Sequence, residues 1–166
     1  MSAACTVWFY SPAKDRVTGL NVINKIVAGL DPPFCHTELQ FPSGEDCSIV
    51  MQGAVTLFWR TFYRGFYTSV LVRASDAALG KALELAQAHV EAETRFGVLG
   101  GRTFCSKLVL DPLCDSGMLE ENAPVHSLVE TPSALFRILQ KRTCVSQPLA
   151  AISFVDKSSL VDILGA

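Results

Sequence analysis

The amino-acid sequence predicts a single α+β domain in which an antiparallel sheet packs against a few helices. Short β-rich segments succeed one another between residues 34 and 72, with turn residues between them, which favours an antiparallel meander. Helical periodicity dominates the second half of the chain. The 166 residues suit one domain, residues 1–166, and a chain of this length buries enough surface to fold without disulfide bridges.

Strands are expected wherever β-rich runs end in turn residues. The first run, residues 5–10, stops at a Ser-Pro pair. Helical spacing of apolar residues predicts a helix over residues 15–30, which an Asp-Pro-Pro sequence ends. Four further strands are predicted at residues 34–41, 47–51, 55–59 and 67–72. A turn at Arg64-Gly65 is expected to join the last two of them and make them neighbours in the sheet.

Two clear helices are predicted in the second half of the chain. Residues 75–93 carry an apolar stripe, and Ser75 is placed to cap the start of that helix. Residues 132–142 follow Thr131 as N-cap and begin with proline, which suits the first helical position. The tail from residue 150 is expected to add a strand and a short helix.

Charge and cysteine content exclude several classes of protein. The chain carries 14 Lys and Arg against 16 Asp and Glu, which argues against a dedicated binder of nucleic acid or anionic membranes. No apolar run reaches the ~20 residues that span a membrane, and no signal-peptide pattern opens the sequence. The six cysteines include no CxxC pair that would indicate structural zinc. We therefore expect a reduced, cytoplasmic protein.

The segment around Cys105 carries the strongest chemical signal. Two glycines lead into Thr103, the expected N-cap of a helix, so that Cys105 falls in the first helical turn. Unpaired N–H groups and the helix dipole favour a negative charge there, and Arg102 and Lys107 lie nearby. A thiol with an ordinary pKa of about 8.5 is thereby pushed toward the nucleophilic thiolate. The alternative is a structural cysteine on the buried face of the helix.

A thiolate nucleophile needs a base that a third group orients, and His36 is the best candidate. It lies in a predicted strand, where alternate side chains share a face. His36, Glu38 and Gln40 therefore point the same way, toward either solvent or a site. Of the other histidines, His89 is expected in an exposed helix pair with Glu93, and His126 in a surface loop.

Two other cysteines are weaker candidates for the nucleophile. Cys35 adjoins His36 but projects from the opposite face of the strand, so the two side chains cannot pair. Cys47 lies beside Glu45 and Asp46, whose carboxylates disfavour a further negative charge. Neither is expected to act as the attacking thiol.

Two segments together resemble the permuted, NlpC-type branch of the papain-like cysteine hydrolases. They are the strand sequence His36-Thr-Glu-Leu39 and, much later, the helix opening Phe104-Cys-Ser-Lys-Leu-Val109. Histidine precedes cysteine in that branch, and residues 130–136 resemble a loop and helix of some members. The resemblance implies a permuted papain-like fold, in which an antiparallel sheet or partial barrel packs against the cysteine-bearing helix and a second long helix. Pro112 departs from the pattern, since it is expected to kink or end the cysteine helix.

The same resemblance implies acyl transfer without a metal or organic cofactor. His36 takes the proton of Cys105, and the thiolate attacks an amide, ester or thioester carbonyl to form an acyl-enzyme. The third polar residue of the family comes from the following strand, which implies Gln52 as the group that orients His36. Glu38 is the alternative, although its spacing of two residues along one strand makes a good bond awkward.

Three functions stay open at this stage. The first is a hydrolase of peptides or amides. The second is a lipid acyltransferase or thioesterase, because relatives of lecithin retinol acyltransferase share the permuted layout. The chain lacks their Asn-Cys-Glu-His motif, and its aromatic residues between positions 58 and 67 suit either a lipid groove or a hairpin core. The third is an inactive binding module that keeps the fold.

Overall fold

The computed structural model describes residues 3–12, 29–49, 53–59, 66–97, 103–119 and 131–145. Within them the fold is α+β, which confirms the predicted class. The strands are β1 (Ala3–Tyr10), β2 (His36–Gln40), β3 (Glu45–Ile49), β4 (Val55–Trp59) and β5 (Tyr67–Ala74). The helices are α2 (Asp76–Glu91), α3 (Cys105–Asp115) and α4 (Pro132–Val145).

Each of these elements was expected close to its observed bounds. Of the helix expected over residues 15–30, only Gly29 and Leu30 lie in the described part of the chain, and both are helical. The strand and helix expected from residue 150 lie outside the described residues.

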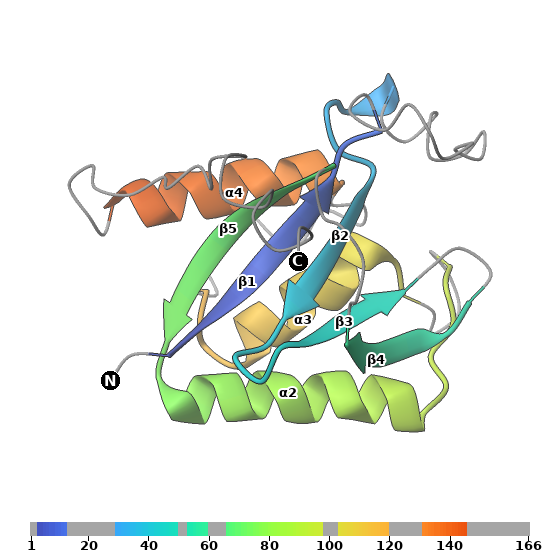
Figure 1. Ribbon diagram of the computed structural model, residues 1–166, viewed down its shortest axis with the longest axis vertical. Coiled ribbons are helices and arrows are strands. Elements are labelled where there is room, and N and C mark those ends of the chain that lie inside the picture. Colours follow the sequence, from blue (N-terminus) through green and yellow to red (C-terminus); the bar gives the residue numbers. More distant parts are fainter. Residues whose placement is uncertain are drawn as a thin grey trace, which may run out of the picture.

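The five strands form one sheet in the order β4-β3-β2-β1-β5 (Figure 1). Every neighbouring pair is antiparallel, and β2, β3 and β4 form the expected meander. The expectation that β4 and β5 are neighbours is wrong, because these two strands are the opposite edges of the sheet. β5 pairs instead along the whole of β1, from Ala3 opposite Ala74 to Tyr10 opposite Tyr67, and buries two of its valines in the core. The expected turn at Arg64-Gly65 lies outside the described residues.

One face of the sheet builds the hydrophobic core. Val7 of β1 is fully buried on this face, opposite Leu39 of β2. Figure 1 shows α3 and α4 behind the sheet and α2 below it. Burial of apolar surface, at roughly 25 cal/mol per Å², is the main stabilising contribution of such a cluster. All three helices contribute to the cluster, through Leu79, Ala82, Ala86, Leu108, Val109, Leu113, Leu135 and Leu139.

The opposite face of the sheet is polar, and much of it is nevertheless buried. Trp8 lies across from Glu38 on this face, and Asp46 and Ser48 of β3 share it. Trp8 Nε1 donates to Gln40 Oε1 at 3.1 Å, and Gln40 Nε2 donates to Asp46 Oδ2 at 3.5 Å. Because buried polar groups persist only when hydrogen-bonded, this network fixes the side chains of the polar face.

Side-chain caps fix the starts of two helices. Ser75 Oγ accepts a hydrogen bond from the N–H of Ala78 at the start of α2. Thr131 Oγ1 accepts from the N–H of Ala134 at the start of α4. Both predicted N-caps are thus confirmed. Within the described segments, no helix combines the length and the apolar character that crossing a membrane requires.

The expected N-cap of α3 needs correction. Phe104, not Thr103, is the N-cap, and no side chain caps this helix. Thr103 precedes the N-cap by one residue, because it is held in an isolated bridge with Phe96. Pro112 does not end the helix, which runs past it. Because proline has no N–H, one hydrogen bond to the carbonyl of Leu108 is lost. The fully buried proline ring packs into the core, and this packing offsets the lost hydrogen bond.

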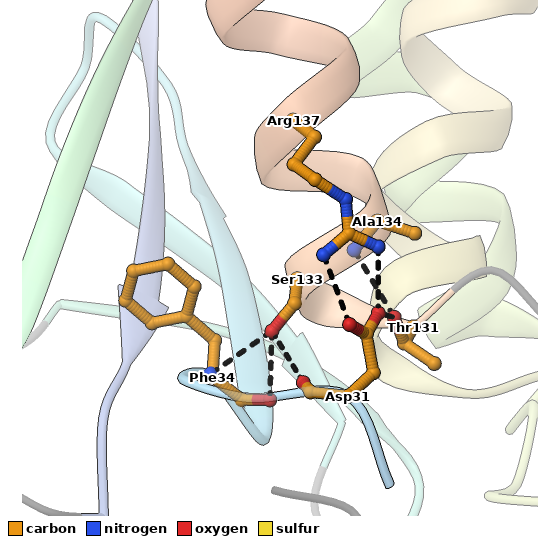
Figure 2. A network of polar contacts seen from close by, with 6 residues as sticks. All are labelled: Asp31, Phe34, Thr131, Ser133, Ala134 and Arg137. Carbon is orange, nitrogen blue, oxygen red and sulfur yellow. Dashed lines mark hydrogen bonds and ion pairs between the residues drawn. The ribbon is translucent and has the colours of Figure 1, made fainter.

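A polar clamp joins the start of α4 to the chain just ahead of β2 (Figure 2). The Asp31 carboxylate accepts two hydrogen bonds from Arg137, each 2.9 Å long, and a third from the Thr131 hydroxyl. Hydrogen bonding from Arg137 holds the pKa of Asp31 below its ordinary value. Ser133 Oγ donates to the Asp31 carbonyl at 2.6 Å and accepts from the N–H of Phe34 at 3.0 Å. This Asp31 clamp fixes the entry to β2.

Ser133→Ala should lower the free energy of unfolding by about 1–3 kcal/mol, because the buried N–H of Phe34 loses its acceptor. Urea denaturation measures the change. Ser43→Ala is the matched control, since Ser43 is an exposed serine that bonds only to the neighbouring Glu45 among the contacts described. The control should stay within about 0.5 kcal/mol of the wild type. Equal losses in the two variants would contradict a stabilising clamp.

Candidate active site

Cys105 is the first residue of α3, which packs against β2 and β3. The residue is only 8% exposed. Its sulfur accepts hydrogen bonds from two backbone N–H groups, those of Thr37 in β2 and of Ser106 in the helix. The first N–H groups of a helix lack partners within it and form the positive end of its dipole. The thiol therefore lies where the backbone stabilises a negative charge.

His36 opens β2, and its imidazole is hydrogen-bonded to the Cys105 thiol. The two residues are far apart in the sequence, but β2 is the central strand of the sheet and α3 lies directly behind it (Figure 1). The His36 side chain keeps 18% of its surface exposed, so the pair is not sealed from solvent. A small reagent or a substrate group therefore has a way to approach the imidazole.

The far side of the imidazole is held by two polar side chains. His36 Nε2 lies 3.1 Å from Ser48 Oγ and 3.3 Å from Glu38 Oε1. Ser48 Oγ also donates to Glu38 Oε1 at 3.3 Å, which uses its only hydrogen. Since the hydroxyl oxygen and the carboxylate can then only accept, we assign the proton to Nε2. Nδ1 is the nitrogen left to face Cys105.

The pKa values of this pair move in opposite directions. Burial alone lowers the pKa of His36, but hydrogen bonds and charge from Cys105 and Glu38 outweigh it and raise the pKa overall. Burial alone raises the pKa of Cys105, yet the hydrogen bond and charge of His36 outweigh it and lower the pKa, helped by the N–H groups of Thr37 and Ser106. Both shifts favour a thiolate–imidazolium pair at neutral pH.

In three other buried cysteines the pKa of the thiol is raised, whereas that of Cys105 is lowered. Burial raises the pKa of Cys5 to about 11, and that of Cys35 and of Cys47 to about 12. The charge of Cys105 adds to the shift at Cys35, and Asp46 and a second carboxylate add to that at Cys47. Protonated thiols are poor nucleophiles, so these three cysteines are expected to be inert at neutral pH.

Of the four residues singled out from the sequence, the structure brings three together: Cys105, His36 and Glu38. The spacing along the strand counted against Glu38, but its side chain bends back far enough to reach the imidazole. Its carboxylate, with its side chain only 3% exposed, supplies the negative charge that the Gln52 amide would lack. Gln52 itself lies outside the described residues.

Ser48 is the contact that the sequence reasoning missed. Leu39 pairs with Cys47, and continuing this register by one residue sets Ser48 opposite Glu38. The signal lies in the Pro-Ser-Gly turn, because the length and type of a hairpin turn fix the register of its strands. Gly44 closes that turn with a φ of +95°, a conformation that side chains other than glycine rarely adopt.

His89 bonds locally, through its Nδ1, to Thr94 Oγ1 at 3.1 Å, whereas the expected partner was Glu93. His126 lies outside the described residues. In the part of the chain that the structure describes, no three His, Cys, Asp or Glu side chains gather to hold a metal ion. No protein-family model matches this chain, and no curated protein or solved structure matches it either. The site is therefore interpreted from its own chemistry.

Proposed function

We propose that this protein is a cysteine-nucleophile hydrolase, a peptidase or amidase of the permuted papain-like type, that works through an acyl-enzyme on Cys105. The observation that carries the proposal is the hydrogen bond between Cys105 and His36, whose far nitrogen is held by Glu38 and Ser48. A nucleophile, a base and an orienting group in this order are what covalent acyl transfer requires. The resemblance of the histidine strand and of the cysteine helix to that family supports the same reading.

The proposed reaction uses His36 first as a base and then as an acid. Nδ1 of His36 takes the thiol proton of Cys105, and the thiolate attacks the carbonyl carbon while the carbonyl electron pair moves to oxygen. The imidazolium then protonates the amine as the C–N bond breaks, which leaves a thioester on Cys105. Water next gives a proton to His36 and attacks the thioester, and the acid is released as the C–S bond breaks and the thiolate–imidazolium pair is restored. Glu38 stabilises the imidazolium by accepting a hydrogen bond from Nε2–H.

Iodoacetamide should alkylate Cys105 well below the pH at which ordinary thiols react, because a lowered pKa keeps the thiolate present as the pH falls. His36→Gln retains a donor for Glu38 but removes the base. Burial then dominates, and the pKa of Cys105 rises. The alkylation rate at pH 6.5 should fall by about tenfold or more, the change in thiolate fraction for a pKa rise of one unit. Mass spectrometry of the Cys105 peptide over a pH series measures the alkylation rate of the wild type and of the variant.

His89→Gln is the matched control, because His89 is a partly buried histidine whose described contact is with Thr94. Its alkylation profile should follow that of the wild type. If the pH profile of alkylation at wild-type Cys105 has the alkaline midpoint of a free thiol, the thiolate–imidazolium pair does not form. The chain is then better described as an inactive module, and the proposal fails.

Acyl transfer itself is tested with three carbonyl reagents: peptide amides, acyl thioesters and p-nitrophenyl acetate. Amide hydrolysis with an acyl group trapped on Cys105 supports the proposed activity. Acylation by thioesters followed by transfer to a lipid amine or alcohol, without amide hydrolysis, makes the protein an acyltransferase and contradicts the hydrolase assignment. No acyl group on Cys105 from any of the three reagents contradicts both.

A further inference from the structure

A buried hydroxyl close to the candidate nucleophile lacks a hydrogen-bond partner. Thr103 is 2% exposed, and among the residues that the structure describes no acceptor or donor lies in reach of its Oγ1. Both of its backbone groups are engaged. Its N–H donates to the carbonyl of Arg95 at 3.1 Å, and its carbonyl accepts from the N–H of Gly97 at 2.8 Å. Unsatisfied buried polar groups are rare in folded proteins, and a catalytic role is one of the few explanations for them.

The backbone between Thr103 and Cys105 aims the two side chains to the same side. Phe104 has φ −133° and ψ 166°, which is extended conformation. Side chains on either side of an extended residue project in one direction, with their Cα atoms roughly 7 Å apart. Both residues are buried, Thr103 at 2% and Cys105 at 8% exposure. A small group bound to the sulfur would lie between them.

The start of α3 points to the same location independently. Its N-cap, Phe104, supplies no side-chain acceptor, and the N–H of Ser106 in the first turn already donates to the Cys105 sulfur. Such N–H groups, with the positive end of the helix dipole, bind anions. Had the helix begun one residue earlier, the Thr103 hydroxyl would itself have served as an N-cap acceptor. The observed start leaves the hydroxyl for another partner, beside the positive end of the helix.

We infer that the Thr103 hydroxyl donates a hydrogen bond to the oxyanion of the tetrahedral intermediate on Cys105, beside the first N–H groups of α3. The inference rests on the proposed function and adds a catalytic residue to it. When the thiolate forms its bond to the carbonyl carbon, the electron pair of the C=O bond moves to oxygen, and Thr103 and the helix N–H groups stabilise that charge. The charge returns to the carbonyl as the leaving group departs. A donor held in place beforehand needs no reorganisation during the step.

Thr103→Val tests this directly, because valine keeps the branched shape and removes the hydroxyl. Acylation of Cys105 by p-nitrophenyl acetate should fall about 10²-fold, the usual loss for one oxyanion donor. Alkylation by iodoacetamide should keep its wild-type rate and pH profile, since attack on a saturated carbon forms no oxyanion. The variant should also melt about 2–4 °C higher than the wild type, because it no longer buries an unsatisfied hydroxyl. A purely structural threonine would instead lower the melting temperature when replaced.

Thr103→Ser is the matched control, since it keeps the hydroxyl, and it should retain most of the acylation rate. If the valine variant does not fold, Thr103→Ala removes the same hydroxyl without adding volume, and the same two rates are measured on it. Equal acylation of the wild type and the folded hydroxyl-free variant overturns the inference and leaves the proposed function standing. A wild-type protein that is alkylated but never acylated overturns the proposed function, and the inference with it.

Discussion

Glu38→Gln should slow hydrolysis of a p-nitrophenyl ester by about 10²–10⁴-fold, the range that a correctly oriented acid–base group contributes. The neutral amide no longer stabilises the imidazolium, and its NH₂ group can face Nε2 and favour the wrong tautomer of His36. Removing the carboxylate also removes one cause of the raised His36 pKa. The thiolate of Cys105 is then lost at a higher pH, and the alkylation profile shifts in the alkaline direction. Steady-state hydrolysis and the alkylation pH series are measured on the same sample.

Glu45→Gln provides the control for this change, because Glu45 lies on the next strand and its described side-chain contact is with Ser43. Its rate and profile should match the wild type. Ser48→Ala should cause a smaller loss than Glu38→Gln, since Nε2 keeps the carboxylate. If the serine variant is inactive while Glu38→Gln is unaffected, the hydroxyl alone orients His36 and the role assigned to Glu38 is wrong.

Phe9→Ala should lower the free energy of unfolding by about 3–5 kcal/mol, the usual cost of truncating a buried aromatic residue. Phe9 is fully buried, and its ring lies 5.4 Å from that of Phe34 and 5.1 Å from that of Phe136. The substitution opens a cavity where β1, the entry to β2 and α4 meet, and it removes both aromatic contacts. Urea denaturation followed by circular dichroism measures the loss.

Tyr10→Ala is the control, because Tyr10 is the next residue of β1, points to the opposite face and is only partly buried. Its ring also contacts an aromatic partner, Tyr67, at 5.3 Å. We expect a clearly smaller loss than for Phe9, since less apolar surface is exposed. Comparable losses in the two variants would contradict the assignment of Phe9 to the core and of Tyr10 to the opposite face.

Local features of the sequence were sufficient to predict most of the elements. The alternation around His36 and the capped stripe after Ser75 each depend on neighbouring residues, and both predictions agree with the structure. The position of β5 is different, because its pairing with β1 joins residues 57 to 71 positions apart, from Tyr10 and Tyr67 to Ala3 and Ala74, and no local pattern encodes the choice of partner. The start of α3 was misplaced for a related reason. The bridge of Thr103 to Phe96 is a tertiary contact, and it outweighs the capping preference of threonine.

The candidate site was predictable to a similar degree. Residue chemistry and element type were enough to select Cys105 and His36, and the structure places them in contact. The partners of Nε2 were harder to predict, because they depend on hairpin register and on the bending of a long side chain. Ser48 follows from the first of these and Glu38 from the second. The unsatisfied hydroxyl of Thr103 had no sequence signature, since a threonine before a helix is ordinarily its cap.

The order of the elements along the chain has a consequence for synthesis. All five strands precede α3, so the ribosome delivers His36 and its two polar partners before it delivers Cys105. Since chains fold from the N-terminal end as they emerge, the sheet can assemble while the thiol is still untranslated. A nascent polypeptide of this kind carries His36 without the thiol to which it is hydrogen-bonded in the fold. The proposed chemistry then becomes possible only when α3, which carries the sulfur, docks against β2.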